Sequence, residues 1–190
     1  MNKFCSPNLY LALAHYPVVN KRGEIISSAV TNLDIHDMAR AARTYGVKAL
    51  FIVTPLEDQQ RLVKTLIAHW TDGAGAAYNP KRREAFESVS IQNSLETAIE
   101  EIASKENGHP QTIVTSAKEH SGAVSITRFR DMLLKGDPYL MIFGTAWGLD
   151  ESYMETADHV LEPIRGCTEY NHLSVRSATS IILDRLLGRM

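Results

Sequence analysis

Short apolar runs alternate along the chain with longer segments in which apolar residues recur every three or four positions. The runs are typical of buried strands and the longer segments of amphipathic helices. The expected strands are Leu9–His15, Val47–Val53, Val89–Gln92, Thr112–Ser116, Tyr139–Phe143 and His159–Glu162. The expected helices are Asp34–Tyr45, Leu56–Trp70, Ser94–Ser104, Ile126–Leu134 and Ser174–Leu187. This alternation predicts an α/β fold, a mainly parallel sheet flanked by helices, with ligands at the carboxyl ends of the strands.

Two segments in the last quarter of the chain predict a ligand-binding site. The apolar run Tyr139–Phe143 is followed by Gly144 and Gly148. Glycines at this place allow the backbone to turn tightly and to approach a ligand that a Cβ would obstruct. Asn171 and Ser174 stand at the start of the final helix, where free N–H groups need partners and can receive part of the same ligand.

Length, charge and cysteine content limit the alternatives without selecting one. The 190 residues, 44% of them hydrophobic, can bury the core of one domain, expected to span residues 1–190. The formal net charge of −2 means that a nucleic acid would have to bind a local basic patch. Cys5 and Cys167 are too few for a disulfide framework, and the apolar run Leu9–Ala14 is short, so we expect a reduced, cytoplasmic setting. No run approaches the roughly 18 residues of a membrane helix.

The first expected helix carries the densest group of polar residues. Its apolar stripe comprises Ile35, Met38, Ala39 and Ala42. His36, Arg40 and Arg43 lie on another face by their spacing, and such a face can bind a phosphate. In the alternative interpretation Asp34 and Asp37 favour the positive end of the helix and the arginines are simply solvated.

Three further patterns have a functional and a structural interpretation. The segment Thr71–Arg83 is rich in glycine and alanine and then basic, which predicts a mobile loop whose Lys81–Arg83 run either binds RNA or is solvated. His15, Asp34, His36 and Asp37 could be metal ligands, but His36 and Asp37 are adjacent on a helix and point apart, so we expect no metal site. Trp147, between the two glycines, could stack on an adenine or a flipped base, or could pack the loop.

The Phe143-Gly144 loop and the Asn171-x-x-Ser174 helix start together resemble the C-terminal motifs of the SPOUT superfamily, the trefoil-knotted RNA methyltransferases. The N-terminal stretch, with Asn32-Leu-Asp-Ile-His-Asp37, looks like a small bacterial branch of these proteins that is described as SAM-dependent RNA methyltransferases. Aligned on Gly46, the first helix resembles the first motif of the 2′-O-methylating branch, in which an arginine six residues earlier acts at the acceptor; Arg40 is the match. Asn32-Leu33-Asp34 stands where that branch has asparagine-x-glycine, so the accepting atom stays open.

The resemblance implies a Rossmann-like fold with a C-terminal trefoil knot, a homodimer, and S-adenosylmethionine as the methyl donor for tRNA or rRNA. It implies that backbone groups of three loops and the start of the last helix hold the cofactor. The residues expected there are Thr115, Ser116, Phe143, Gly144, Gly148, Leu149, Ile164, Arg165, Gly166, Asn171, Leu173 and Ser174.

The same resemblance implies catalytic roles for three residues of the first helix. An electrophilic methyl group mainly needs an oriented nucleophile. Arg40 stays protonated, so we expect it to clamp a phosphate or to stabilise a forming oxyanion, and we expect Asp34 or His36 to accept the proton.

Two other functions remain as alternatives. One is a metal-assisted hydrolase that uses His15, Asp34 and His36, and the other is a knotted RNA-binding protein without catalysis. A hydrolase should bind a divalent ion and ignore S-adenosylmethionine, whereas an inactive RNA binder should bind RNA with or without the cofactor.

Overall fold

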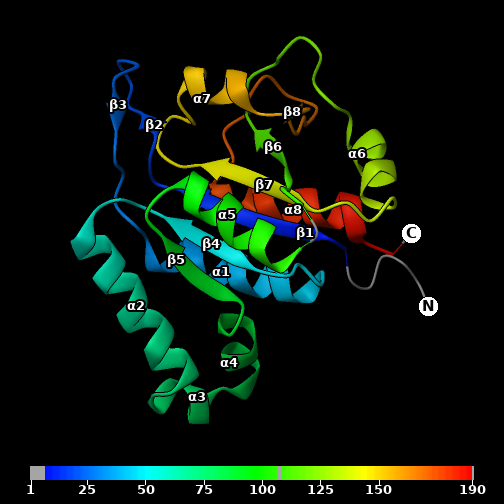
Figure 1. Ribbon diagram of the computed structural model, residues 1–190. Helices are drawn as coiled ribbons and strands as arrows, with labels where there is room; N and C mark the ends of the chain where they lie inside the picture. The colour runs from blue at the N-terminus through cyan, green and yellow to red at the C-terminus, as the bar shows by residue number, and fades with distance from the viewer. Residues whose placement is uncertain (1–6, 107, 190) are drawn as a thin grey trace.

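The computed structural model describes residues 7–106 and 108–189 and is built around a parallel sheet (Figure 1). Its strands are β1 (Leu9–Ala14), β4 (Leu50–Val53), β5 (Val89–Gln92), β6 (Gln111–Thr115), β7 (Tyr139–Gly144) and β8 (His159–Leu161). They lie in the order β5-β4-β1-β7-β6-β8, and each pair is parallel. The mainly parallel α/β fold expected from the sequence is confirmed.

Side chains of β1 alternate between two hydrophobic layers, as a strand buried on both faces requires. Leu9, Leu11 and Leu13 join the layer that is covered by α1 (Asn32–Thr44), α6 (Ile126–Leu133) and α8 (Val175–Leu187). Tyr10 and Ala12 join the opposite layer, which is covered by α5 (Leu95–Lys105) and α7 (Glu151–Thr156). Every residue of β1 is buried, so the strand fixes the centre of the sheet.

Local signals in the sequence explain where several helices begin. Ser94 and Thr97 form a capping box at the start of α5. Ser125 and Ser174 accept hydrogen bonds from the backbone N–H groups of Arg128 and Ser177 at the starts of α6 and α8. Ser174, which we expected at the cofactor site, thus stabilises the start of α8 as its N-cap.

The expectation of a mobile loop over Thr71–Arg83 is wrong. After α2 (Glu57–Thr71) the chain forms α3 (Ala74–Tyr78) and α4 (Pro80–Phe86). Asn79 caps α4 by accepting from the N–H of Arg82, and Pro80 occupies its first turn, where a missing N–H costs nothing. The guanidinium of Arg82 lies 4.5 Å from the centre of the Trp70 ring, so part of the basic run packs against α2.

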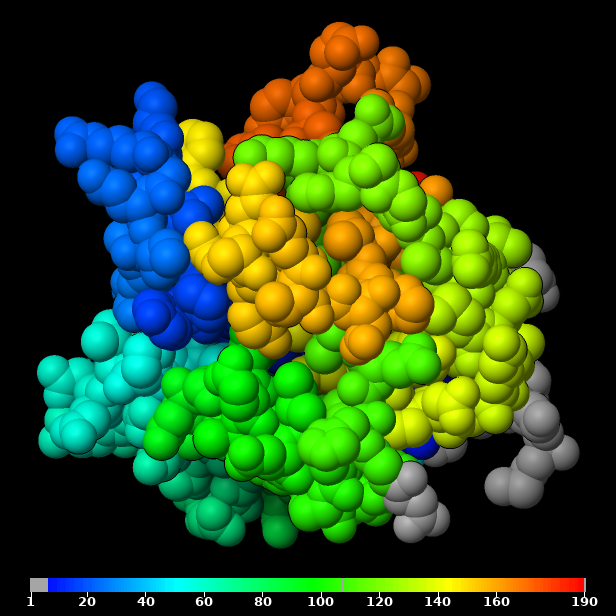
Figure 2. Space-filling model, turned by 45° about the horizontal axis from the view of Figure 1, so that its top comes forward, coloured from blue at the N-terminus to red at the C-terminus, as the bar shows by residue number. Residues whose placement is uncertain are grey.

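A short hairpin after β1 was not expected from the sequence. Its strands β2 (Val18–Val19) and β3 (Ile25–Ile26) pair antiparallel, and they stand out from the molecule in Figure 2. Each strand has only two residues, too few for an alternating pattern to be recognised. No helix in the described part of the chain is long and apolar enough to cross a membrane. Cys167 is an exposed free thiol, and Cys5 lies outside the described residues.

Candidate functional site

The carboxyl ends of β1 and β7 meet at the point where the strand order reverses direction. Strands β4 and β5 follow on one side of β1, whereas β7, β6 and β8 follow on the other. Such a switch point is where open α/β sheets bind their ligands, because the loops after the two strands diverge there. Ala14 of β1 pairs with Gly144 of β7, so the glycine that the sequence singled out lies at this point.

A chain of polar side chains ties these two strand ends together. Nδ1 of His15 lies 2.9 Å from the Ser28 hydroxyl, and that hydroxyl lies 2.5 Å from the hydroxyl of Thr145. The Thr145 hydroxyl donates to the carbonyl of Ala14 at 2.9 Å. Thr145 lies in the loop between Gly144 and Gly148, but Ser28 belongs to no pattern in the sequence, so this connection could not be predicted.

His15 is 1% exposed, and its Nε2 is buried without a hydrogen bond. Burial lowers the pKa of His15 to about 4, against the opposing influence of the Asp34 carboxylate and the Ala29 carbonyl. A histidine with this pKa is neutral at pH 7, because removing the charged imidazolium from water is unfavourable. His15 therefore joins the two loops as an uncharged group.

The loop after β7 folds back on itself at Gly144. A Cβ on Gly144 would lie 2.6 Å from the backbone nitrogen of Leu149, which no side chain tolerates. Gly148 has φ +109°, and Ala146 has φ +52°, a left-handed conformation that is unfavourable for a residue with a Cβ. The turn is therefore tight, as expected. The space left by the missing Gly144 side chain, however, is filled by the loop's own backbone.

Side chains of this loop divide into buried and exposed ones. Phe143 and Leu149 are buried in the two hydrophobic layers, so either could contribute only backbone groups to a ligand. Trp147 is 60% exposed. Because the ring is exposed, Trp147 does not pack the loop. The interpretation in which it stacks on an adenine or a flipped base remains.

The loops after β6 and β8 lie beside the β7 loop, because β6 pairs with both β7 and β8. The Thr115 hydroxyl donates to the Ile142 carbonyl, and the Ser116 hydroxyl accepts from the N–H of Lys118. The Asn171 amide donates to the carbonyl of Ala117 at 2.9 Å, which joins the β8 loop to the β6 loop. The three loops expected to hold the cofactor thus share one edge.

A cavity of about 450 Å³ lies between the β6 and β8 loops. Its lining comprises Glu119, His120, Ser121, Gly122, Ala123, Glu162, Pro163 and Arg165. Arg165 and Glu119 form an ion pair across it. Ile164 packs against the core, whereas Gly166 and Leu173 are exposed. The volume lies within the range of small-molecule sites, and the lining carries both signs of charge.

The start of α1 is joined to α8 by an ion pair. Asp34 is 9% exposed, and its carboxylate accepts from Thr31 and, at 2.8 Å, from Nη1 of Arg176. Nε of Arg176 lies 3.5 Å from Asp37. Arg176 was missed, because its partners lie about 140 residues away and no local pattern marks such a pair. Arg40 is mostly in solvent, with its Nη1 3.9 Å from Asp37.

His36 lies apart from Asp34, although the two are close in sequence. Its ring packs against Trp70 at 5.3 Å and Phe86 at 4.8 Å between ring centres. Burial lowers the pKa of His36, and nearby Arg82 lowers it further. Among the residues that the structure describes, no group of three His, Cys, Asp or Glu side chains is placed to hold a metal ion. The metal site that the hydrolase alternative requires is therefore missing from this part of the chain.

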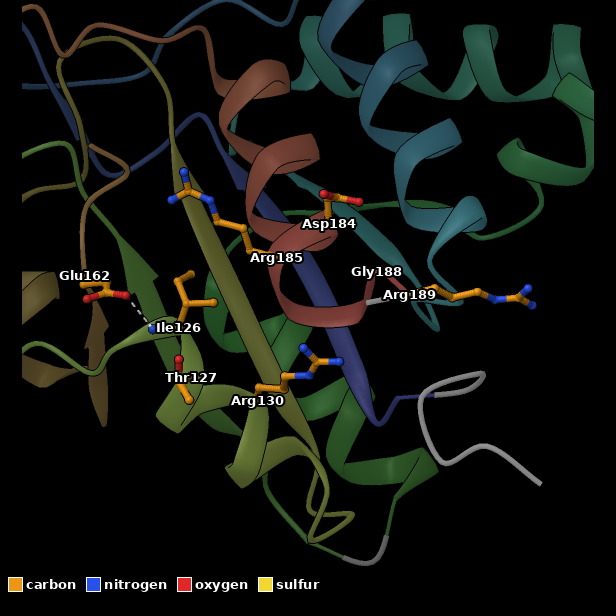
Figure 3. A pocket seen from close by; sticks show the side chains of 8 residues that line it. All are labelled: Ile126, Thr127, Arg130, Glu162, Asp184, Arg185, Gly188 and Arg189. Carbon is orange, nitrogen blue, oxygen red and sulfur yellow. Dashed lines mark hydrogen bonds between the residues drawn. The ribbon is translucent and has the colours of Figure 1, made fainter. Parts of the chain in front are cut away.

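A second cavity of about 420 Å³ lies between α6 and the end of α8 (Figure 3). Its lining comprises Ile126, Thr127, Arg130, Glu162, Asp184, Arg185, Gly188 and Arg189. The N–H of Ile126 donates to the Glu162 carboxylate at 2.8 Å, drawn as a dashed line. Glu162 is the one lining residue that belongs to the three loops described above, so the first cavity is the better candidate for the cofactor.

Comparison with known proteins identifies the family. Residues 8–188 match the family described as SAM-dependent RNA methyltransferase. A curated protein of Oleidesulfovibrio alaskensis, named tRNA (guanine-N(1)-)-methyltransferase, is 45% identical over 183 residues, which are 95% of this chain and 42% of that protein. An uncharacterized protein of Aquifex aeolicus is 38% identical over 183 residues, 96% of this chain and 89% of that protein.

A solved structure supports the fold at low sequence identity. The chain resembles the TrmH/SpoU tRNA modifying enzyme of A. aeolicus with a TM-score of 0.57 and 14% identity, over 97% of this chain and 76% of that one. The chain spans less than half the length of the curated tRNA methyltransferases that it matches. The match over residues 8–188 nevertheless covers the whole sheet and all three loops, and the chain belongs to the family of SAM-dependent RNA methyltransferases.

Proposed function

We propose that the protein transfers a methyl group from S-adenosylmethionine to tRNA or rRNA. The observation that carries this proposal is the meeting of the loops after β6, β7 and β8 at one edge of the sheet. S-Adenosylmethionine carries an ammonium, a carboxylate and a sulfonium group. The acidic side chains and Arg165 around the 450 Å³ cavity suit that combination of charges.

The accepting atom cannot be taken over from the curated relatives. Their name includes guanine N1, but the chain covers only 42% of each of them. The unmatched part is longer than this chain and is large enough for a catalytic domain of its own. We therefore propose RNA methylation and leave the choice between a ribose hydroxyl and a base nitrogen to experiment.

Residues of α1 would act on the acceptor. The cofactor would supply an electrophilic methyl group, so the protein mainly has to orient the nucleophile. We assign Arg40, exposed on α1, to an RNA phosphate or a developing negative charge on the acceptor. Asp34 is the better candidate for the proton acceptor, because the side chain of His36 packs among aromatic rings.

The proposal includes the trefoil knot and the homodimer that the resemblance implies. Passage of the segment after β8 through the preceding loops would form the knot. An apolar surface supports the dimer. Leu33 at the start of α1 is 65% exposed, and Leu173 just before α8 is 44% exposed. The Asp34–Arg176 ion pair joins the starts of α1 and α8, and the two leucines stand next to these starts in the sequence.

Calorimetry with S-adenosylmethionine tests this function. We expect the wild-type protein to bind the cofactor and to ignore added Mg²⁺ or Zn²⁺. Absence of cofactor binding would remove the methyltransferase proposal. Binding of a divalent ion alone would favour a hydrolase, and RNA binding that is the same with and without cofactor would favour a non-catalytic protein. Mass spectrometry of RNA from a deletion strain would identify the RNA and the atom.

A further inference from the structure

The hairpin β2–β3 and the exposed Trp147 form a surface that the proposed transfer chemistry does not use. Figure 2 shows this hairpin standing out on one side of the loops at the strand ends. At its base Val18 is buried in the core and Ile26 packs against it, whereas residues 21–25 at its tip are exposed and contribute little to the core. Its hydrogen bonds and charges indicate what it does instead.

The turn of the hairpin is held in one shape by Asn20. The Asn20 side-chain oxygen accepts from the N–H groups of Arg22 at 2.8 Å and Glu24 at 3.1 Å. Its side-chain nitrogen donates to the Glu24 carboxylate at 2.7 Å. The backbone of Asn20 also pairs with Gly23 and Glu24. Lys21 and Arg22 therefore project from a rigid turn, which lowers the entropy lost when they bind a partner.

Backbone hydrogen bonds place Trp147 beside this turn. The N–H of Trp147 donates to the Val19 carbonyl at 3.1 Å, and the N–H of Val19 donates to the Gly148 carbonyl at 3.0 Å. Val18 forms an antiparallel bridge with Leu149. Continued by two residues, that register sets Trp147 opposite Asn20, immediately before Lys21 and Arg22.

Charge distinguishes the hairpin tip from the other basic run. Lys21 and Arg22 are exposed, and no ion pair joins either side chain to another described residue. In the run Lys81–Arg83, by contrast, Lys81 pairs with Glu84, Arg83 pairs with Glu87, and Arg82 packs on Trp70. The hairpin tip therefore carries two positive charges that are available to an anion.

We propose that this surface binds an unpaired segment of the RNA substrate, with one base stacked on Trp147 and the neighbouring phosphates bound by Lys21 and Arg22. An exposed indole next to fixed cations is the combination that single-stranded nucleic acids recognise, because every base has a face to stack and every nucleotide carries a phosphate. A duplex offers the phosphates but keeps its bases stacked inside. The inference rests on the proposed function, since it describes how the same site selects its RNA.

Tryptophan fluorescence tests the stacking directly, because Trp70 and Trp147 are the only tryptophans. We expect a ten-nucleotide single-stranded RNA of mixed sequence to quench the emission of the wild type. The same RNA as a duplex should quench it much less, and Trp147→Phe should lose most of the change. Trp147→Ala should weaken binding of the single strand about tenfold. Equal binding of duplex and single strand, or quenching that survives in Trp147→Phe, would overturn the proposal.

Charge reversal tests the hairpin tip. The double variant Lys21→Glu/Arg22→Glu should bind single-stranded RNA at least tenfold more weakly. The slope of log affinity against log salt should fall by about 1.4, the contribution of two phosphates. The matched control Lys81→Glu/Arg83→Glu makes the same charge change on α4 and should bind nearly as the wild type does. A larger loss in the control than in the hairpin variant would contradict the proposal.

Cofactor calorimetry on the same variants separates this inference from the proposed function. Lys21→Glu/Arg22→Glu should bind S-adenosylmethionine with wild-type affinity. If the wild type binds the cofactor but no RNA quenches Trp147, the proposed function stands and the surface is not an RNA site. If S-adenosylmethionine alone quenches Trp147, the ring stacks on the adenine of the cofactor and the inference is wrong.

Discussion

Arg40 extends from α1 with most of its side chain in solvent, and its ion pair with Asp37 spans 3.9 Å. An exposed pair of this kind contributes roughly 0–1 kcal/mol to stability. Arg40→Ala should therefore leave the melting temperature nearly unchanged. If Arg40 acts on the acceptor, methylation of RNA should fall about a hundredfold while the affinity for S-adenosylmethionine stays the same. Methyl-transfer rates, calorimetry and thermal unfolding measure the three quantities.

Arg43 provides the matched control for Arg40, because it lies on the same helix and is also exposed. It pairs with Glu84 of α4, through two of its nitrogens. Arg43→Ala should keep full methylation. Full methyl transfer by Arg40→Ala on the true RNA would make Arg40 a solvated surface residue and would move the acceptor role to Asp34.

His15 makes stability depend on pH. Its pKa is about 4 in the folded protein and about 6.5 in the unfolded chain, so between these values the unfolded chain binds more protons. The free energy of unfolding should then be highest above pH 6.5 and should fall by roughly 3 kcal/mol as the pH drops to 4. Urea unfolding at a series of pH values measures this slope. His36, with its lowered pKa, adds to the slope in the same direction.

A variant of His15 isolates its share of that slope. His15→Gln removes the titrating group, so the stability of this variant should fall less between pH 6.5 and pH 4. The same slope in His15→Gln and the wild type would show that His15 is not the group that titrates.

At the scale of elements, the loop after β7 depends on Gly144. A Cβ at this position would lie 2.6 Å from the Leu149 nitrogen, so Gly144→Val should displace the loop. We expect the affinity for S-adenosylmethionine to fall at least tenfold, equivalent to about 1.4 kcal/mol. Calorimetry measures the affinity, and chemical denaturation should show that unfolding remains cooperative.

Gly75→Ala is a control with a clash of similar size far from the three loops. Its Cβ would lie 2.7 Å from the Trp70 ring, so this variant should lose stability and keep its affinity for the cofactor. Unchanged cofactor affinity in Gly144→Val would show that the β7 loop does not hold the cofactor.

The sequence predicted those elements whose periodicity is long enough to identify them. β5 occupies the expected range Val89–Gln92, and α1 and α8 agree to within two residues at each end. β2, β3 and α3 were missed because two to five residues cannot show a period. Glycine and alanine in residues 73–77 suggested a loop, but Asn79 and Pro80 define the start of α4 after it. The residues that start this helix could be recognised in the sequence, but the interpretation gave more weight to the glycine and alanine content of the preceding segment.

The parts of the candidate site that lie at strand ends could be predicted from the sequence. The parts that depend on side-chain contacts between residues distant in sequence could not. Parallel strands bring their carboxyl ends to one edge, which is why Gly144 and Thr115 could be placed together. The His15–Ser28–Thr145 connection and the Asp34–Arg176 ion pair join residues from different parts of the chain. The catalytic role expected for His36 was based on its helix face. The spacing of residues on a helix does not reveal that Trp70 and Phe86 cover the His36 side chain.

At the scale of the whole molecule, α8 divides its apolar residues between the core and the surface. Ile182, Leu186 and Leu187 are buried within the chain. Val175, Ala178 and Ile181 are only partly buried, and their spacing forms a stripe along the helix. The surface left for a partner is therefore limited to this stripe and to the exposed Leu33 at the start of α1, which the Asp34–Arg176 ion pair joins to α8.

We expect two copies of the chain to associate through this surface. Light scattering at micromolar concentration should give about twice the 21.2 kDa mass of one chain. Leu33→Asp together with Ala178→Glu should shift the equilibrium to the monomer, because each introduces a charge that would be buried in the interface without a partner. Leu62→Asp on α2, equally polar and at an exposed leucine away from α8, should remain dimeric. A wild-type mass near that of one chain at this concentration would contradict the dimer, and would require a single subunit to complete the site with its own α1 and hairpin.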